Sequence, residues 1–113
     1  MDLRLGEIVL IQLQFHQTRG AKIRPVVIVL DTGDEDVIAA PVTSRTRATE
    51  FDLMLADWQA AGLNVQSTVR VHKLAVLSKA GVRHMVGKLT QRDLVSFCAV
   101  LCRAFCPGSE SVS

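Results

Sequence analysis

Cationic, hydroxyl and imidazole side chains occur at the ends of apolar stretches in this sequence. Arg24 precedes one such stretch, Thr43 and Ser44 end the next, and Arg70 and His72 lie in a third. A base, a guanidinium and a hydroxyl together can accept a proton, stabilise a pentavalent phosphorane and assist a leaving oxygen. These residue types therefore fit cleavage of an RNA phosphodiester, in which the attacking 2′-hydroxyl belongs to the substrate.

The element that positions Arg24 is an apolar run that begins directly after Pro25 and extends from Val26 to Leu30. Proline fixes its own φ and favours an extended conformation for the residue before it. A run without polar alternation predicts a strand that is covered on both faces. We therefore expect Arg24 at the mouth of a buried strand, where it handles an anion; the alternative is that it caps the strand in a surface salt bridge.

Arg70 and His72 lie two residues apart in the stretch from Ser67 to His72, which predicts another strand. Side chains two residues apart on a strand point to the same face. On this interpretation the imidazole lies beside the guanidinium and accepts the 2′-hydroxyl proton, a role suited to imidazole near neutrality. The alternative is that His72 positions RNA or packs beside Lys73.

Two long windows of the sequence contain no acidic residue, namely those between Glu7 and Asp31 and between Asp57 and Asp93. If these windows meet in space, they form one basic face that suits a polyanion such as nucleic acid. The alternative is an ordinary solvated surface. The residues near the candidate catalytic groups that we expect to bind RNA are Arg19, Lys22, Ser44, Arg45 and Lys73.

Composition indicates one globular domain. The chain has 113 residues, of which 49% are hydrophobic and 21% charged, enough for a single buried core. We expect the domain to cover residues 1–106 and the Pro-Gly-Ser tail at 107–113 to be disordered. No apolar stretch approaches the ~20 residues that span a bilayer. We therefore expect a cytoplasmic protein without membrane association.

Three cysteines lie near the C-terminus at helical spacing, without a neighbouring histidine: Cys98, Cys102 and Cys106. We expect them to be small buried hydrophobes. Glycine-rich nucleotide loops, nucleophile elbows and spaced metal ligands are missing from the sequence. No cofactor and no metal are therefore expected.

Short apolar stretches separated by turn residues predict strands at 6–15, 26–30, 37–42, 51–55, 67–72, 74–77 and 84–89. One substantial helix is predicted from Thr90 to Phe105, with Thr90 and Asp93 placed as in a capping box. Its apolar residues cover nearly the whole circumference, so it needs cover on more than one side. The expected fold is mainly β, a small curved sheet or barrel with a C-terminal helix packed against it.

Six segments in order resemble the PemK/MazF family of toxins: Gly6–Leu10, Arg24–Val29, Pro41–Ser44, Asp57–Leu63, Ser67–Leu74 and Gly87–Thr90. The resemblance covers roughly residues 5–105. It implies the SH3-like barrel of the PemK/MazF/CcdB toxin type. It also implies a homodimeric, metal-independent endoribonuclease that cuts single-stranded RNA, leaves a 2′,3′-cyclic phosphate and a 5′-hydroxyl, and is inhibited by a cognate antitoxin.

Individual residues of this sequence match positions in the family's motifs. Arg24 matches the Arg of the family's Arg-Pro motif, Thr43 its hydroxyl at the end of the third strand, and Arg70 the Arg of Val-Val-Arg-x-Asp. His72 stands where that last motif has Asp, and His16 lies in the first loop, where some members carry a His. Two other functions stay open: a non-catalytic toxin that binds a protein target, as gyrase-poisoning relatives do, and an RNA-binding module without catalysis.

Overall fold

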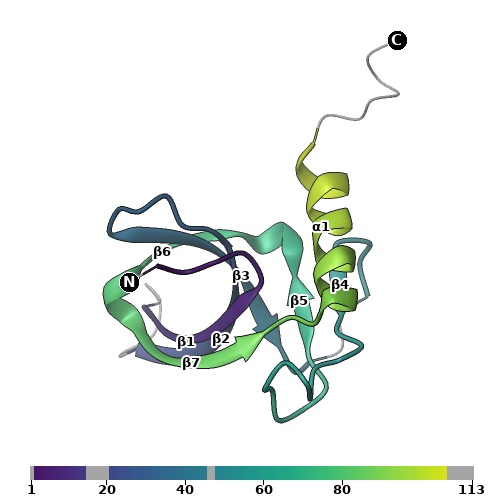
Figure 1. The fold of residues 1–113 in the computed structure, drawn as a ribbon, viewed down its shortest axis with the longest axis horizontal. Helices are drawn as coiled ribbons and strands as arrows, with labels where there is room; N and C mark the ends of the chain where they lie inside the picture. Colours follow the sequence, from purple (N-terminus) through teal and green to yellow (C-terminus); the bar gives the residue numbers. More distant parts are fainter. Residues whose placement is uncertain (1, 15–20, 46–47, 107–113) are drawn as a thin grey trace.

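The computed structural model describes residues 2–14, 21–45 and 48–106. Within them the chain forms seven strands followed by a C-terminal helix (Figure 1), which confirms the predicted mainly β fold. The elements are β1 (Glu7–Gln14), β2 (Ala21–Leu30), β3 (Asp36–Thr43), β4 (Asp52–Met54), β5 (Thr68–Arg70), η1 (Val71–Lys73), β6 (Ala75–Ser78), η2 (Lys79–Gly81), β7 (Val82–Lys88) and α1 (Gln91–Phe105). No helix in these ranges is long and apolar enough to cross a membrane.

All strand pairs in the sheet are antiparallel, in the order β4-β5-β3-β2-β1-β7, and β6 also pairs with β3. The strands curl around one another, and α1 lies beside β4 and β5 (Figure 1). Because β1 pairs with both β2 and β7, the two acid-free windows of the sequence meet in space.

Side chains from both faces of the central strands are buried in two separate hydrophobic clusters. Val27 contributes to the cluster that includes Phe97 of α1, whereas Val26 and Ile28 contribute to the cluster on the other face. All three are at most 1% exposed. The prediction that this strand is covered on both faces is therefore confirmed for Val26–Ile28, whereas Leu30, at its end, is 49% exposed.

Strands β2 and β3 separate at two prolines. Their last pair is Val26 with Pro41; before Val26, β2 pairs with β1, and after Pro41, β3 pairs with β5 through Val42 and Thr43. Proline lacks the backbone N–H that a ladder requires, so it is placed where pairing stops. The strand also starts earlier than predicted, at Ala21, because the hairpin with β1 extends past the point where β3 leaves.

The predicted strand over Ser67–His72 is wrong at its C-terminal end. β5 ends at Arg70, and Val71 begins the 3₁₀ turn η1, with its N–H donating to the Phe51 carbonyl at 3.1 Å. The pairing with β4 stops at Asp52 and Arg70. His72 therefore does not continue the face of the strand on which Arg70 lies.

The helix α1 begins as predicted, with the Thr90 hydroxyl accepting from the Asp93 N–H at 3.4 Å. The Asp93 carboxylate instead accepts from the N–H groups of Ala56 and Asp57 at 3.0 and 2.8 Å. The first turn of α1 therefore fixes the segment that follows β4.

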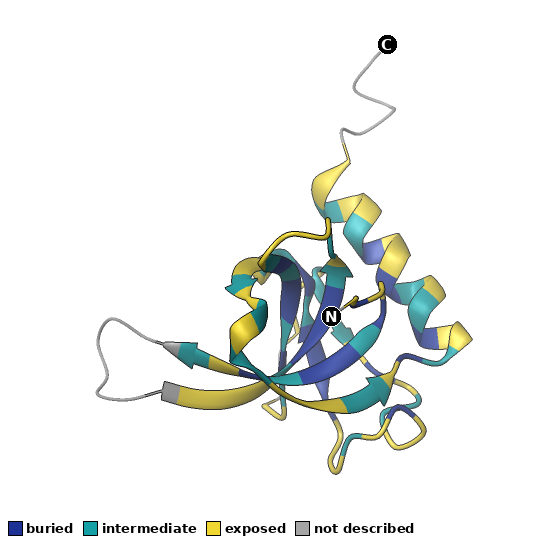
Figure 2. Ribbon diagram, turned by 60° about the vertical axis from the view of Figure 1, so that its left-hand side comes forward, coloured by how far each residue is buried: buried dark blue, intermediate teal, exposed yellow. Residues whose placement is uncertain are grey.

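The expectation that the three cysteines are buried is wrong, since Cys98, Cys102 and Cys106 are all exposed. The sheet covers the side of α1 that carries Phe97 and Val100, and the outer side lies at the surface (Figure 2). Leu94 and Leu101 also pack against the core at the edges of this side, whereas Val95 and Phe105 are exposed.

Candidate functional site

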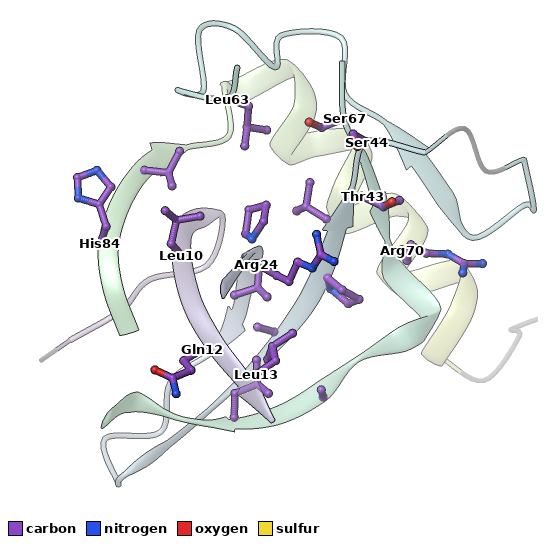
Figure 3. A pocket seen from close by; sticks show the side chains of 18 of the residues that line it. Leu10, Gln12, Leu13, Arg24, Thr43, Ser44, Leu63, Ser67, Arg70 and His84 are labelled. Carbon is purple, nitrogen blue, oxygen red and sulfur yellow. The ribbon is translucent and has the colours of Figure 1, made fainter. Parts of the chain in front are cut away.

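An open groove of about 1510 Å³ lies where β2 and β3 separate. Arg24, Thr43 and Arg70 line it together with apolar residues of β1, β6 and β7 (Figure 3). The segment from Gly62 to Val65 forms a further part of its wall. Residues from seven separate parts of the chain therefore contribute to one site.

Arg24 and Thr43 face each other across the gap between the two strands. They lie two residues beyond the last pair, Val26 and Pro41, one on each strand, so both project to the face of that pair. Figure 3 shows the Arg24 side chain directed toward Thr43. A guanidinium and a hydroxyl thus line the same part of the groove.

The Thr43 hydroxyl is oriented by the chain that follows it. Its Oγ1 accepts from the Arg45 N–H at 3.1 Å, which leaves the O–H hydrogen for a ligand because a hydroxyl donates one hydrogen bond. The same turn exposes Ser44 and Arg45 in the groove. The site therefore combines hydroxyl donors with cations.

Arg70 forms an ion pair with its cross-strand neighbour. Its Nε donates to Asp52 Oδ1 at 2.9 Å, and the Asp52 side chain has no exposed surface. Burial acts to raise the pKa of Asp52, but hydrogen bonds from Arg70 and Thr49 outweigh it, so this pKa lies below its ordinary value. The carboxylate is therefore ionised at neutral pH.

Two glycines allow the Gly62–Val65 wall to pack directly on β7. Gly62 has φ +97°, and a Cβ at Gly62 or Gly87 would collide with the backbone of Val86 or Ala61, respectively. This close approach places Leu63 beside Val86 at the groove. Within the described residues, no three His, Cys, Asp or Glu side chains form a group that could hold a metal ion.

Residues 4–105 match the family model described as "PemK-like, MazF-like toxin of type II toxin-antitoxin system". The chain belongs to the PemK/MazF toxin family. The match covers both groove-forming strands and α1, as the motif resemblance predicted. A comparison with curated protein sequences gives no significant match.

Solved structures of this PemK/MazF type share the fold. A mycobacterial endoribonuclease in complex with its cognate antitoxin aligns with TM-score 0.75 and 18% identity over 95% of this chain and 99% of that chain. The Mycobacterium tuberculosis toxin MazF-mt6 gives 0.72 and 21%, covering 88% and 95% of the two chains. MazF from Deinococcus radiodurans gives 0.67 and 21%, covering 88% and 92%.

The groove of this PemK/MazF toxin brings together five of the residues singled out in the sequence: Arg24, Thr43, Ser44, Arg45 and Arg70. Lys22 and Lys73 are exposed but do not line it. Arg19 and His16 lie outside the described residues.

His72 does not line the groove of the toxin. Its ring lies against Phe51, with centroids 5.8 Å apart and planes at 46°. Its Nδ1 is buried, with no hydrogen-bond partner in the part of the chain that the structure describes. The prediction that His72 shares a face with Arg70 is wrong, because the 3₁₀ turn rotates it away.

Sequence reasoning missed several polar residues that line the groove, among them Gln12, Asn64 and His84. His84 is exposed on β7 and pairs with Leu10 of β1. Nothing local marks it as a site residue. His84 reaches the groove because β7 pairs with β1, a segment about 70 residues earlier in the chain. Only a prediction of that pairing could have identified it.

Proposed function

We propose that this chain is the toxin of a type II toxin–antitoxin system and acts as a metal-independent endoribonuclease on single-stranded RNA. The observation that carries the proposal is the pair formed by Arg24 and Thr43 in an open groove that also contains Arg45 and Arg70. Membership of the PemK/MazF family supports it. Cleavage follows attack of the 2′-oxygen on the adjacent phosphorus, and the bond to the 5′-oxygen breaks. The products are a 2′,3′-cyclic phosphate and a 5′-hydroxyl.

The roles of Arg24 and Thr43 follow from their chemistry. The Arg24 guanidinium presents a planar set of donors that matches the oxygens of a phosphoryl group. Charge accumulates on these oxygens in the phosphorane, where a preorganised donor is worth most. The Thr43 hydroxyl donates to a non-bridging oxygen. Neither residue accepts the 2′-hydroxyl proton, since a guanidinium remains protonated near neutrality.

The proton acceptor is an imidazole in this proposal, because no carboxylate lines the groove among the described residues. His84 lines the groove, with its ring directed away from Arg24 and Thr43 in Figure 3, whereas His72, the residue named from the sequence, does not line it. The acceptor takes the proton from the 2′-hydroxyl, and the 5′-oxygen takes a proton from solvent water as it leaves. Cleavage rates of His84→Ala and His72→Ala across pH 5 to 8 separate them. Loss of the acidic limb identifies the base.

A cognate antitoxin, a homodimeric state and a cytoplasmic location complete the proposal. The mycobacterial endoribonuclease of the same fold is described in complex with its cognate antitoxin. For this chain, an adjacent small reading frame that encodes a DNA-binding protein would provide the partner. Co-expression of that protein should relieve growth inhibition by the toxin.

Incubation of purified protein with single-stranded RNA in EDTA tests the activity. The expected result is sequence-dependent fragments that carry 2′,3′-cyclic phosphate and 5′-hydroxyl ends. Arg24→Ala should lower the rate by about 10²–10³, the usual effect of removing one transition-state donor. Growth inhibition without any RNA cleavage would instead favour the protein-targeting toxin.

A further inference from the structure

The buried carboxylate of Asp52 fixes Arg70 at one end of the groove. Asp52 Oδ1 accepts from Arg70 Nε at 2.9 Å, and Oδ2 accepts from the hydroxyl and the N–H of Thr49 at 2.8 and 3.1 Å. The Arg70 side chain keeps 22% of its surface exposed. With Nε engaged, the two Nη groups remain to bind an anion in the groove.

Arg70 and Arg24 are anchored at different places along the groove. Arg24 lies on β2, whereas Arg70 lies on β5, on the other side of β3. Because β2 has already separated from β3 at Arg24, the backbones at the two arginines lie at least two strand spacings apart, roughly 10 Å or more. Arg70 also lies two residues along β5 from Thr68, the partner of Thr43, which adds about 7 Å along the strands. Figure 3 shows the Arg24 side chain directed toward Thr43 and the Arg70 guanidinium directed away from both.

The two guanidiniums also differ in charge environment. Arg70 is paired with an ionised carboxylate, while Arg24 has no carboxylate partner among the described residues. A paired guanidinium is a weaker electrostatic partner for charge that develops during reaction, but its fixed Nη groups still form directional hydrogen bonds. Arg70 is therefore better suited to hold a ground-state phosphate than to stabilise the phosphorane.

We propose that Arg70 binds a phosphate that flanks the scissile one, and that Asp52 is its positioning residue. The inference rests on the proposed function, because it takes RNA as the substrate. Arg24 and Thr43 then hold the scissile phosphate, and Arg70 sets the register of the strand by holding a neighbour. This assignment moves Arg70 from the chemical step, where the sequence placed it, to substrate binding.

Single phosphate replacements provide the test. RNA oligonucleotides carry a 2′-deoxy residue at the cleavage position, which prevents reaction, and one uncharged methylphosphonate at the scissile or at a flanking position. Binding is measured for wild type, Arg70→Gln and a matched control, Arg4→Gln, which removes a cation outside the groove. We expect one flanking methylphosphonate to weaken RNA binding by the wild-type protein as much as the Arg70→Gln substitution weakens binding of unmodified RNA. That replacement should not affect Arg70→Gln, whereas Arg4→Gln should behave as wild type.

Salt dependence and kinetics supply independent readouts. Loss of one phosphate contact to a single strand should reduce the slope of log K against log salt by about 0.7 in Arg70→Gln. On cleavable RNA, this variant should raise KM about tenfold, as expected for a lost charged hydrogen bond, with kcat near wild type. Asp52→Asn should shift KM in the same direction, and the double variant should resemble Arg70→Gln because Asp52 acts through Arg70.

Three results would overturn the assignment: coupling of Arg70 to the scissile phosphate, coupling to no phosphate, or a fall in kcat of about 100-fold at unchanged KM. Wild-type protein that binds no RNA would overturn both this inference and the proposed function. Wild type that binds with flanking-phosphate coupling but does not cleave would overturn the catalytic proposal alone. Thermal unfolding of Asp52→Asn shows whether it folds, and Arg70→Gln decides the question if it does not.

Discussion

At the scale of single residues, some side chains near the groove project into it and can contact RNA, whereas others pack inside the fold. Arg24 and Thr43 project into the gap between β2 and β3. His72 instead packs on Phe51 with a buried ring nitrogen that lacks a partner in the described chain. A polar atom buried without a hydrogen bond costs free energy, so this histidine is a destabilising choice for a purely structural position.

We expect His72→Phe to retain cleavage and to raise the free energy of unfolding by up to about 1 kcal/mol, because the ring contact with Phe51 is kept and an unpaired nitrogen is removed. Urea unfolding and RNA cleavage measure the two effects. Loss of cleavage in a folded His72→Phe protein would restore His72 as the proton acceptor, and His84→Phe is the matched comparison.

Among the elements, α1 stabilises the sheet through its first turn as well as through its apolar side. Asp93 is 2% exposed and accepts from two backbone N–H groups of the segment after β4. Asp57 in that segment accepts from Arg92 and Thr90, and these hydrogen bonds lower its pKa. The helix terminus and the loop are thus joined by charged hydrogen bonds.

Asp93→Ala should therefore lower the free energy of unfolding by about 1–3 kcal/mol, since it leaves the N–H groups of Ala56 and Asp57 without acceptors. Chemical denaturation measures the change. Glu35→Ala, which removes an exposed carboxylate from the turn between β2 and β3, is the control and should have little effect. Equal stability of the two variants would show that the loop does not depend on Asp93.

The turn after β2 predicts a specific acid response. Hydrogen bonds from Lys79, Leu3 and Gly33 lower the pKa of Asp31 from 3.8 to about 2. A carboxyl with a depressed folded-state pKa contributes stability above its unfolded value, and this contribution is lost as pH falls from about 4 to 2. Asp31→Asn should flatten this part of the stability curve, measured by urea unfolding at successive pH values. An unchanged acid limb would contradict the assignment.

For the whole molecule, the outer side of α1 is an apolar surface without a partner in the described chain. Val95, Cys98, Cys102 and Phe105 follow a 3-4-3 spacing and are all exposed, as Figure 2 shows for the outer face of the helix. Residues at this spacing form the apolar row, or seam, through which two helices pack against each other. It supports the homodimer expected from the apolar circumference of the helix.

We expect a dimeric mass by light scattering at micromolar concentration, and a monomeric mass for the double variant Val95→Asp, Phe105→Asp, because buried carboxylates cannot pack in an apolar seam. Ser96→Asp adds a charge on the side of α1 that carries Arg103, outside the seam, and should remain dimeric. A monomeric wild type would exclude the homodimer.

Local sequence determined much of this protein by itself. The buried strand at Val26–Ile28, the N-cap at Thr90 and the existence of the short β-strands follow from patterns of neighbouring residues, and the structure confirms them. Arg24 and Thr43 could be placed near strand ends from the sequence, because each stands beside a proline or a strand end that fixes the backbone, and both line the groove; their roles in the reaction stay a prediction.

Tertiary structure decided the positions that depend on distant partners. The pairing of β5 with β4 stops at Arg70 and Asp52, and the 3₁₀ turn that follows takes His72 out of the strand; pairing of β1 with β7 brings His84 to the groove. The cysteines are exposed because a curved sheet covers one side of a helix and not its circumference. Long-range pairing and surface curvature leave no periodic signal in sequence, and for this reason the structure was needed to place these residues.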